Sequence, residues 1–92
     1  MENLIKLNNY HLFTFQTTSH SLKAEKILKS VNMEFTTIPT LREISTSCGL
    51  SIKVRSSDYL KIKELLNKHK IQVAAIYKVD KIDNKNYLEK LV

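Results

Sequence analysis

Hydrophobic residues recur along the chain with two different periods, which predict strands and helices in alternation. The aromatic-rich segment 10–16 is typical of a strand. Residues 17–19 are all good N-cap types, and the apolar residues after them follow the i, i+3, i+4, i+7 spacing of an amphipathic helix. These apolar positions are Ala24, Ile27, Leu28 and Val31. A strand followed by a helix is therefore expected in the first third of the chain.

A second strand is predicted over residues 33–38, and Pro39 ends it because proline has no N–H to donate to a neighbouring strand. A polar connection then leads to Gly49. In residues 50–55 apolar and polar side chains alternate, which predicts a third strand with one buried face and one face in solvent. The apolar set is Leu50, Ile52 and Val54, and the polar set is Ser51, Lys53 and Arg55.

The remaining residues predict one more helix and one more strand. Residues 56–58 offer an N-cap, and the helical spacing returns at Ile62, Leu65, Leu66 and His69. Residues 72–79 are β-prone, with Val73, Ala75, Tyr77 and Val79 on one face. Residues 80–92 are polar with a small amphipathic finish, so we expect a short helix or a loose tail there.

The order strand, helix, strand, strand, helix, strand predicts an α+β fold. It is the order of the ferredoxin-like βαββαβ sandwich, in which two helices cover one face of an antiparallel sheet. A doubly wound parallel sheet is less favoured, because no helix joins the second and third strands. We expect one domain over residues 10–79, with an N-terminal extension over residues 1–9 and a C-terminal tail or short helix over residues 80–92.

Composition and charge exclude several classes of partner. The 92 residues are 42% hydrophobic and 26% charged, which is ordinary for one globular domain. No apolar run approaches the roughly 20 residues that span a bilayer, so no membrane partner is expected. The net charge is +6, but thirteen of the fifteen basic residues are lysines spread over the whole length. With two arginines and no tryptophan, we expect no nucleic-acid partner; solvated lysine-rich faces or docking to an acidic protein explain the charge.

The chain has a single cysteine, Cys48, and its surroundings are polar. It lies in the hydroxyl-rich stretch 44–50, beside the only glycine, Gly49. One cysteine forms no internal disulfide, so redox or group-transfer chemistry would need a second molecule. The reducing cytoplasm is accordingly the expected compartment.

The expected topology places this thiol at one edge of the sheet. Strands one and two would run parallel with strand three between them, so the connection 39–49 would lie where strand one ends and the first helix begins. Cys48 is then predicted to lie near residues 17–19 and their unpaired amides, whose partial positive charge favours a thiolate. His20 and His69 are predicted at the same edge, as nearby bases.

Each of these residues also has a purely structural interpretation. Cys48 has the parity of the apolar row in the third strand and could extend it as a small buried hydrophobe. His69 would then be a helix-end residue, His20 a solvent-facing residue and Arg42 a surface charge instead of an anion clamp. The spacing of cysteine and histidines does not indicate a metal site, and a phosphate-binding glycine loop is missing, so no cofactor is expected.

Two segments carry a family resemblance. The first is Phe15-Gln16-Thr17-Thr18 together with Glu25, and the second runs from Ile38-Pro39-Thr40 through Arg42 and Ser45 to Cys48-Gly49-Leu50. Over residues 10–79 the chain resembles the small bacterial DUF3343 family, described as selenium/sulfur carrier proteins. It departs from the family pattern at Thr17, where serine is usual, at Ser21, where alanine is usual, and at Leu41, where a second proline is common.

The resemblance implies a carrier, not an enzyme in its own right. Cys48 would hold sulfur or selenium as a persulfide or perselenide, between a donor of the cysteine desulfurase or selenocysteine lyase type and an acceptor enzyme. The residues implied to surround and stabilise the anion are Thr17, Thr18, Arg42, Ser45, Ser47 and Gly49. The alternative is a small ligand-binding or regulatory module with a structural cysteine; domains of this kind often pair through the open sheet face, which permits a homodimer but does not require one. A thiol-dependent enzyme that uses His20 or His69 as a base is a third hypothesis.

Overall fold

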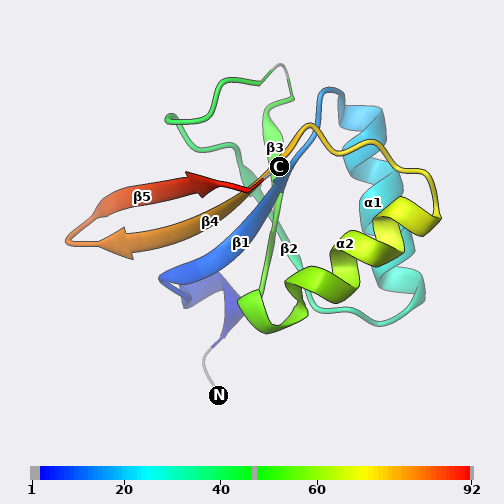
Figure 1. Cartoon of the computed structure of the whole chain (residues 1–92), viewed down its shortest axis with the longest axis horizontal. Helices are drawn as coiled ribbons and strands as arrows, with labels where there is room; N and C mark the ends of the chain where they lie inside the picture. Colours follow the sequence, from blue (N-terminus) through cyan, green and yellow to red (C-terminus); the bar gives the residue numbers. More distant parts are fainter. Residues whose placement is uncertain (1–2, 47, 92) are drawn as a thin grey trace.

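The computed structural model describes residues 3–46 and 48–91 of the chain, and this part folds into two helices and one five-stranded sheet (Figure 1). Single 3-10 turns, η1 (Leu4–Lys6) and η2 (Ser56–Asp58), precede the first strand and the second helix. The helices are α1 (Thr18–Ser30) and α2 (Tyr59–Lys68). The strands are β1 (Asn9–Thr14), β2 (Thr36–Pro39), β3 (Leu50–Val54), β4 (Ala75–Ile82) and β5 (Lys85–Lys90).

The sheet confirms the predicted ferredoxin-like sandwich. Its strand order is β2-β3-β1-β4-β5, and every pair of neighbours is antiparallel. Ile52 of β3 pairs with Phe13 of β1 on one side and with Thr37 of β2 on the other. Strands β1 and β2 therefore run parallel with β3 between them. As a result, the connection from β2 to β3 lies at the edge where β1 ends.

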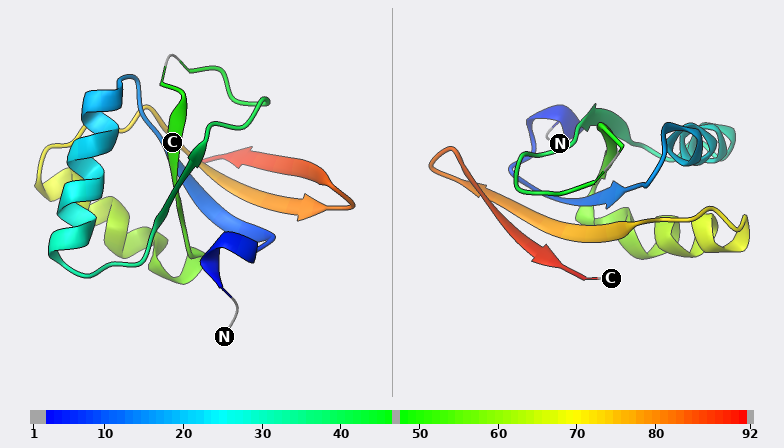
Figure 2. Two further views of the ribbon diagram at one scale, coloured as in Figure 1. Left: turned by 180° about the vertical axis from the view of Figure 1, so that it is seen from behind. Right: turned by 90° about the horizontal axis from the view of Figure 1, so that it is seen from above.

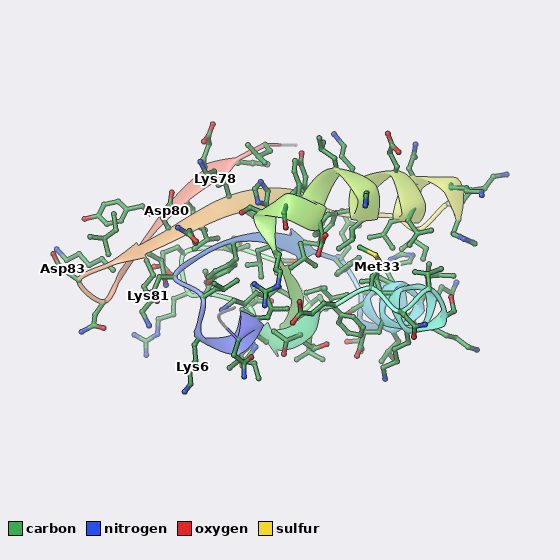
Figure 3. The ribbon with its side chains drawn as sticks, turned by 90° about the horizontal axis from the view of Figure 1, so that it is seen from below. Lys6, Met33, Lys78, Asp80, Lys81 and Asp83 are labelled. Carbon is green, nitrogen blue, oxygen red and sulfur yellow. The ribbon has the colours of Figure 1, made fainter. Side chains whose placement is uncertain are left out.

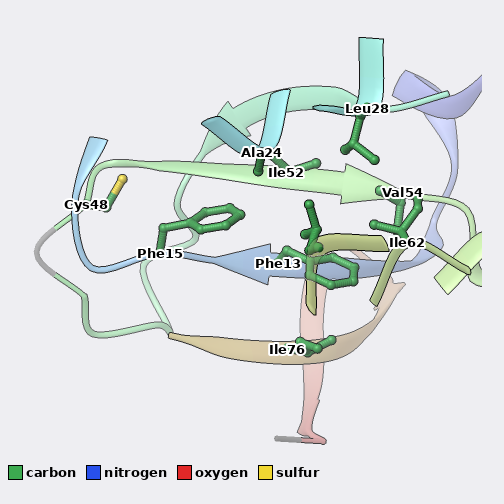
Figure 4. Packing of buried hydrophobic residues seen from close by; sticks show 10 residues of the cluster. Phe13, Phe15, Ala24, Leu28, Cys48, Ile52, Val54, Ile62 and Ile76 are labelled. Carbon is green, nitrogen blue, oxygen red and sulfur yellow. The ribbon is translucent and has the colours of Figure 1, made fainter. Parts of the chain in front are cut away.

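Both helices cover one face of the sheet, and the larger of two apolar cores lies between the helices and this face (Figures 2 and 4). Each helix places residues of its apolar stripe against alternate residues of the central strands. Phe13 is fully buried and, together with Phe15, has the largest side chain in this core. The other members are Phe15, Ala24, Leu28, Cys48, Ile52, Val54, Ile62, Leu66 and Ile76.

The opposite face of the sheet is also covered, so the prediction of a solvent-facing polar row on β3 was wrong. Ser51 is fully buried and Lys53 is only 5% exposed. Leu41 and Ile44, from the connection between β2 and β3, lie over this face and pack with Tyr10 and other side chains in a second apolar cluster. A long connection can cover a sheet face without a periodic pattern, which is why alternation alone did not reveal this burial.

Lys53 ties the N-terminal segment to this second face. Its Nζ donates hydrogen bonds to the carbonyl oxygens of Ile5 (3.1 Å) and Leu7 (3.0 Å) and lies 4.2 Å from the centre of the Tyr10 ring. Burial, and secondly the charge of Lys81, lowers the pKa of Lys53 below its ordinary value. Burial, and secondly the charge of Glu43, raises the pKa of Tyr10. A charged side chain thus closes the end of an apolar cluster and satisfies two backbone acceptors.

The C-terminal residues form a hairpin, so the expected short helix or loose tail was wrong. Strand β4 extends to Ile82, and β5 pairs antiparallel with it from Lys85 onward. The two residues between them, Asp83 and Asn84, have φ angles of 51° and 65°. Aspartate and asparagine tolerate this left-handed conformation, which the tightest hairpin turns require at both positions. The sequence lacks the usual glycine at this turn, and so the hairpin was missed.

Candidate functional site

The connection from β2 to β3, residues 40–49, is the Cys48 loop, and Thr40 closes its base. The backbone N–H of Thr40 donates to the carbonyl oxygen of Gly49 at 3.0 Å. The Thr40 hydroxyl donates to the carbonyl oxygen of Cys48 at 3.1 Å and lies 2.7 Å from the Ser51 Oγ. These bonds continue the β2–β3 ladder into the loop and fix where Cys48 enters the third strand.

Thr46 joins the Cys48 loop to the turn between β1 and α1. Its hydroxyl donates to the carbonyl oxygen of Phe15 at 2.8 Å, and the backbone N–H of Cys48 donates to the same hydroxyl at 3.4 Å. Figure 4 shows Cys48 beside this turn, next to Phe15 at one end of the helix-side core. Cys48 and the start of α1 therefore share one edge of the sheet.

Thr17 caps α1 at that edge. Its hydroxyl accepts a hydrogen bond from the backbone N–H of His20 at 3.3 Å and lies 3.0 Å from the His20 Nδ1. A threonine cap satisfies one of the unpaired amides of a helix N-terminus. The contact between the Thr17 hydroxyl and Nδ1 holds the His20 ring at the helix start, and within the described residues no hydrogen bond joins this ring to Cys48.

Cys48 is buried in this conformation, in agreement with its interpretation as a small hydrophobe that extends the apolar row of the third strand. Its residue is 2% exposed and belongs to the helix-side core with Phe15 and Ala24. The Sγ donates to the carbonyl oxygen of Leu50 at 3.3 Å, a bond that a thiol makes and a thiolate does not. Cys48 is an even number of residues from Ile52 and Val54, and alternate residues of an extended chain point to the same face. Its side chain therefore joins theirs in the core although its neighbours in the sequence are polar.

In the described part of the chain, no hydrogen bond joins any of the remaining predicted residues to the Cys48 thiol. Thr18 begins α1 and is exposed, and Arg42, Ser45 and Gly49 are exposed on the Cys48 loop. A Cβ built on Gly49 would meet nothing within 4 Å and the residue has no positive φ, so the fold does not require glycine there. His69 is exposed at the C-cap of α2, and no hydrogen bond between it and Cys48 is present among the described residues. Ser47 lies outside the described residues.

An open cavity of ≈ 300 Å³ borders the loop on the side away from the helices. Thr46 lines it, and its hydroxyl also accepts a hydrogen bond from the Cys48 backbone N–H. The other lining residues are Thr14, Gln16, Ser45, Ala74, Ala75, Tyr77 and Lys90. A larger cavity of ≈ 770 Å³ lies elsewhere, between α2 and the start of β4.

In residues 3–46 and 48–91 no group of three or more histidine, cysteine or acidic residues is arranged to hold a metal ion.

A polar contact between buried His11 and exposed Ser56, which the sequence gave no means to find, lies at the opposite end of the sheet. His11 is 7% exposed, and its Nδ1 lies 2.8 Å from the Ser56 Oγ. The imidazole stacks on the Tyr59 ring with their centres 4.2 Å apart. These partners come from η2 and the start of α2, so the pair locks the second helix to β1.

His11 is expected to make the fold less stable in acid. Burial, and secondly the charge of Lys78, lowers its pKa below 6.5, although Asp80 and Glu89 act in the opposite direction (Figure 3 shows Lys78 and Asp80 on β4). The unfolded chain then takes up the proton first as the pH falls through 6.5, and stability declines until the lowered pKa is passed. Above pH 6.5 the imidazole is neutral in both states and has no such effect.

The measurement is urea unfolding of the wild type and His11→Phe at pH 7 and pH 5. The phenylalanine keeps the stacking on Tyr59 but removes the titration. The wild type should lose more stability between the two pH values than the variant does, by up to about 1.4 kcal/mol per pH unit. Equal losses in both proteins would show that His11 does not contribute to acid sensitivity.

Ser21→Ala is expected to stabilise the protein by about 1 kcal/mol. Ser21 is fully buried on α1, and its hydroxyl has no hydrogen-bond partner among the described residues. Alanine removes the unpaired hydroxyl and has a higher helix propensity. Thermal and urea unfolding measure the change, and an unchanged or lower stability would imply a partner for the hydroxyl, such as an internal water.

Comparison with known proteins assigns most of the chain to one family. The family model described as "Putative Se/S carrier protein-like" matches residues 10–78, three quarters of the chain, and this range includes the Cys48 loop and the start of α1. Searches of curated proteins and of solved structures found no match. None of the helices in the described part of the chain is long and apolar enough to cross a membrane.

Proposed function

Since the chain belongs to the Se/S carrier protein-like family, we propose that it carries sulfur or selenium on Cys48, between a donor enzyme and an acceptor enzyme. The observation that carries this proposal is that the family match spans a loop holding the chain's single thiol. A carrier needs no second thiol, because a second thiol would attack the persulfide and release its cargo as a disulfide forms. The protein would act as a co-substrate of two enzymes in a reducing cytoplasm, where free thiols persist.

The proposed transfer balances atoms and charge. A donor enzyme of the desulfurase type holds a persulfide on its own cysteine. The Cys48 thiol loses its proton, and the thiolate attacks the outer sulfur of the donor persulfide. The new Sγ–S bond forms as the donor S–S bond breaks, and the donor thiolate leaves. The acceptor repeats the step on the Cys48 persulfide, which regenerates the Cys48 thiolate; selenium follows the same course as a perselenide.

The burial of Cys48 implies that loading accompanies an opening of the Cys48 loop. Thr40 and Thr46 hold the loop closed through hydrogen bonds to Cys48 and to Phe15. Breaking one or two such bonds costs about 1–3 kcal/mol, so an open state is within reach of local fluctuations. Opening would bring the thiol to the exposed Arg42 and Ser45 and to the amides of α1, which would stabilise the anion. Closing would shelter the cargo.

One observation favours the alternative of a ligand-binding or regulatory module. A fully sheltered cysteine with a bonded Sγ is also what a structural cysteine looks like. The two functions differ in one measurable property: a carrier becomes modified on Cys48 when a donor is active, whereas a module does not.

The test is incubation of the purified protein with cysteine and a cysteine desulfurase, followed by intact-mass spectrometry. A carrier gains about 32 mass units, or about 79 when a selenium donor replaces the sulfur donor, and loses them on addition of a reductant. Alanine release from cysteine confirms that the donor is active. An unchanged mass while alanine accumulates would contradict the carrier function and leave the module as the remaining hypothesis.

A further inference from the structure

Among the described residues, no strand pairs with the outer edge of β5. Strand β5 ends the strand order, and the hairpin extends away from both helices (Figures 1 and 2). The two-residue turn makes Ile82 and Lys85 a hydrogen-bonded pair. Every second residue of β5, beginning with Lys85, therefore directs its backbone N–H and C=O groups toward β4. The bond from the Leu91 N–H to the Ile76 carbonyl oxygen (2.8 Å) continues this alternation. The backbone groups of the intervening residues, Asn86, Leu88 and Lys90, therefore point outward to an empty edge.

The side chains on one face of β5 are self-complementary. Lys85, Tyr87 and Glu89 lie on the same face because they are alternate residues of the strand. All three are exposed, Tyr87 by 54%. The positive and the negative charge are each two residues from Tyr87, on opposite sides. If a second β5 strand runs antiparallel to the first with the two Tyr87 residues opposite each other, Lys85 of each strand lies opposite Glu89 of the other.

We propose that β5 pairs antiparallel with β5 of a second copy of this chain, with Tyr87 on the two-fold axis. Lys85 then faces the partner's Glu89, and symmetry repeats this ion pair on the other side of the axis. Tyr87 faces the partner's Tyr87, which buries two exposed aromatic rings against each other. The two five-stranded sheets would form one continuous sheet across the dimer.

The backbone allows this register and disfavours its neighbours. Asn86 faces the partner's Leu88, and both residues have outward N–H and C=O groups, so two reciprocal hydrogen-bonded pairs form. Centring the pairing on Asn86 would place Glu89 opposite the partner's Asp83, and centring it on Leu88 would place Lys85 opposite the partner's Leu91. If the two-fold axis passed between two neighbouring residues, each residue with outward N–H and C=O groups would face a partner residue whose groups point toward its own β4. Only the Tyr87-centred register satisfies both the backbone and the charges.

The other edge of the sheet is less suited to such pairing. Strand β2 has four residues and ends in Pro39, which lacks an N–H. It carries no charged residue that could fix a register. Strand β5 also lies outside residues 10–78, the part of the chain that matches the family model, so the pairing stands independently of the carrier function.

Charge reversal tests the proposed dimer. Sedimentation velocity should show a concentration-dependent change from 10.7 kDa to twice that mass at protein concentrations up to about 1 mM. Lys85→Glu and Glu89→Lys should each raise the dimer Kd about tenfold or more, because two attractive pairs become repulsive. The double variant restores both pairs with reversed sign and should restore dimerisation. Lys61→Glu, the same charge change on the exposed face of α2, should leave the Kd unchanged.

Cysteine cross-linking tests the register itself. In a Cys48→Ser background, Tyr87→Cys places two thiols directly opposite each other at a non-hydrogen-bonded pair, about 4.5 Å apart at Cα. Mild oxidation should link these chains at least tenfold faster than it links Lys85→Cys chains, whose thiols lie on opposite sides of the axis. A wild type that stays at 10.7 kDa throughout, or cross-linking that is equal at both positions, would overturn the proposal.

Discussion

Cys48→Ser is expected to abolish loading by a sulfur or selenium donor. The chain has no other thiol, so no other residue can form a persulfide. Serine keeps a donor for the Leu50 carbonyl oxygen, which Cys48 bonds through its Sγ at 3.3 Å, and we expect stability to change by about 1 kcal/mol or less. The incorporated sulfur is measured with a persulfide-selective reagent after incubation with the donor.

The result depends on a folded variant, which urea unfolding verifies. Loss of the adduct in a folded Cys48→Ser protein would match the carrier function. An adduct that persists in this variant at the wild-type level would place the chemistry on a side chain other than the thiol and would contradict the proposal.

Thr46→Val is expected to raise the rate of Cys48 alkylation about tenfold. Valine preserves the shape of threonine but removes the bond to the Phe15 carbonyl oxygen (2.8 Å) and the acceptor for the Cys48 N–H. Losing about 1–2 kcal/mol from the closed loop enlarges the open population by roughly this factor. The measurement is the pseudo-first-order rate of reaction with iodoacetamide at constant pH.

Thr37→Val provides a matched control for this experiment. It is the same substitution on the neighbouring strand β2, at a buried hydroxyl that has no hydrogen-bond partner among the described residues. The control should leave the alkylation rate unchanged and slightly increase stability. If Thr46→Val and Thr37→Val react at the wild-type rate alike, the Cys48 loop does not control access to the thiol.

The two helices, the first four strands and their order followed from hydrophobic periodicity, and the arrangement of these four strands followed from the order. The spacing of Ala24 and Leu28 identified α1, and the parity of Ile52 and Val54 identified β3. The same parity correctly raised the possibility that Cys48 is buried. Ser45 and Gly49 beside it are exposed on the loop, while Cys48 itself belongs to the helix-side core.

Features that depend on contacts between distant segments could not be found from local patterns. Lys53 reads as a solvent-facing residue until the N-terminal segment is placed over it. Thr46 finds its acceptor at Phe15, and this pairing depends on tertiary structure alone. The β5 hairpin was missed because its turn is formed by Asp83 and Asn84 with left-handed backbones and no glycine. The edge shared by Cys48 and the start of α1 did follow from topology, since it depends only on strand order.

The most direct measurement is peptide mapping of the protein after donor incubation. Alkylation under denaturing conditions, digestion and tandem mass spectrometry locate any added sulfur or selenium. We expect the added mass on the peptide that contains Cys48, and its release as sulfide or selenide in equimolar amount when a thiol is added. Added mass on any other peptide, or an unmodified Cys48 after the donor has turned over, would contradict the account.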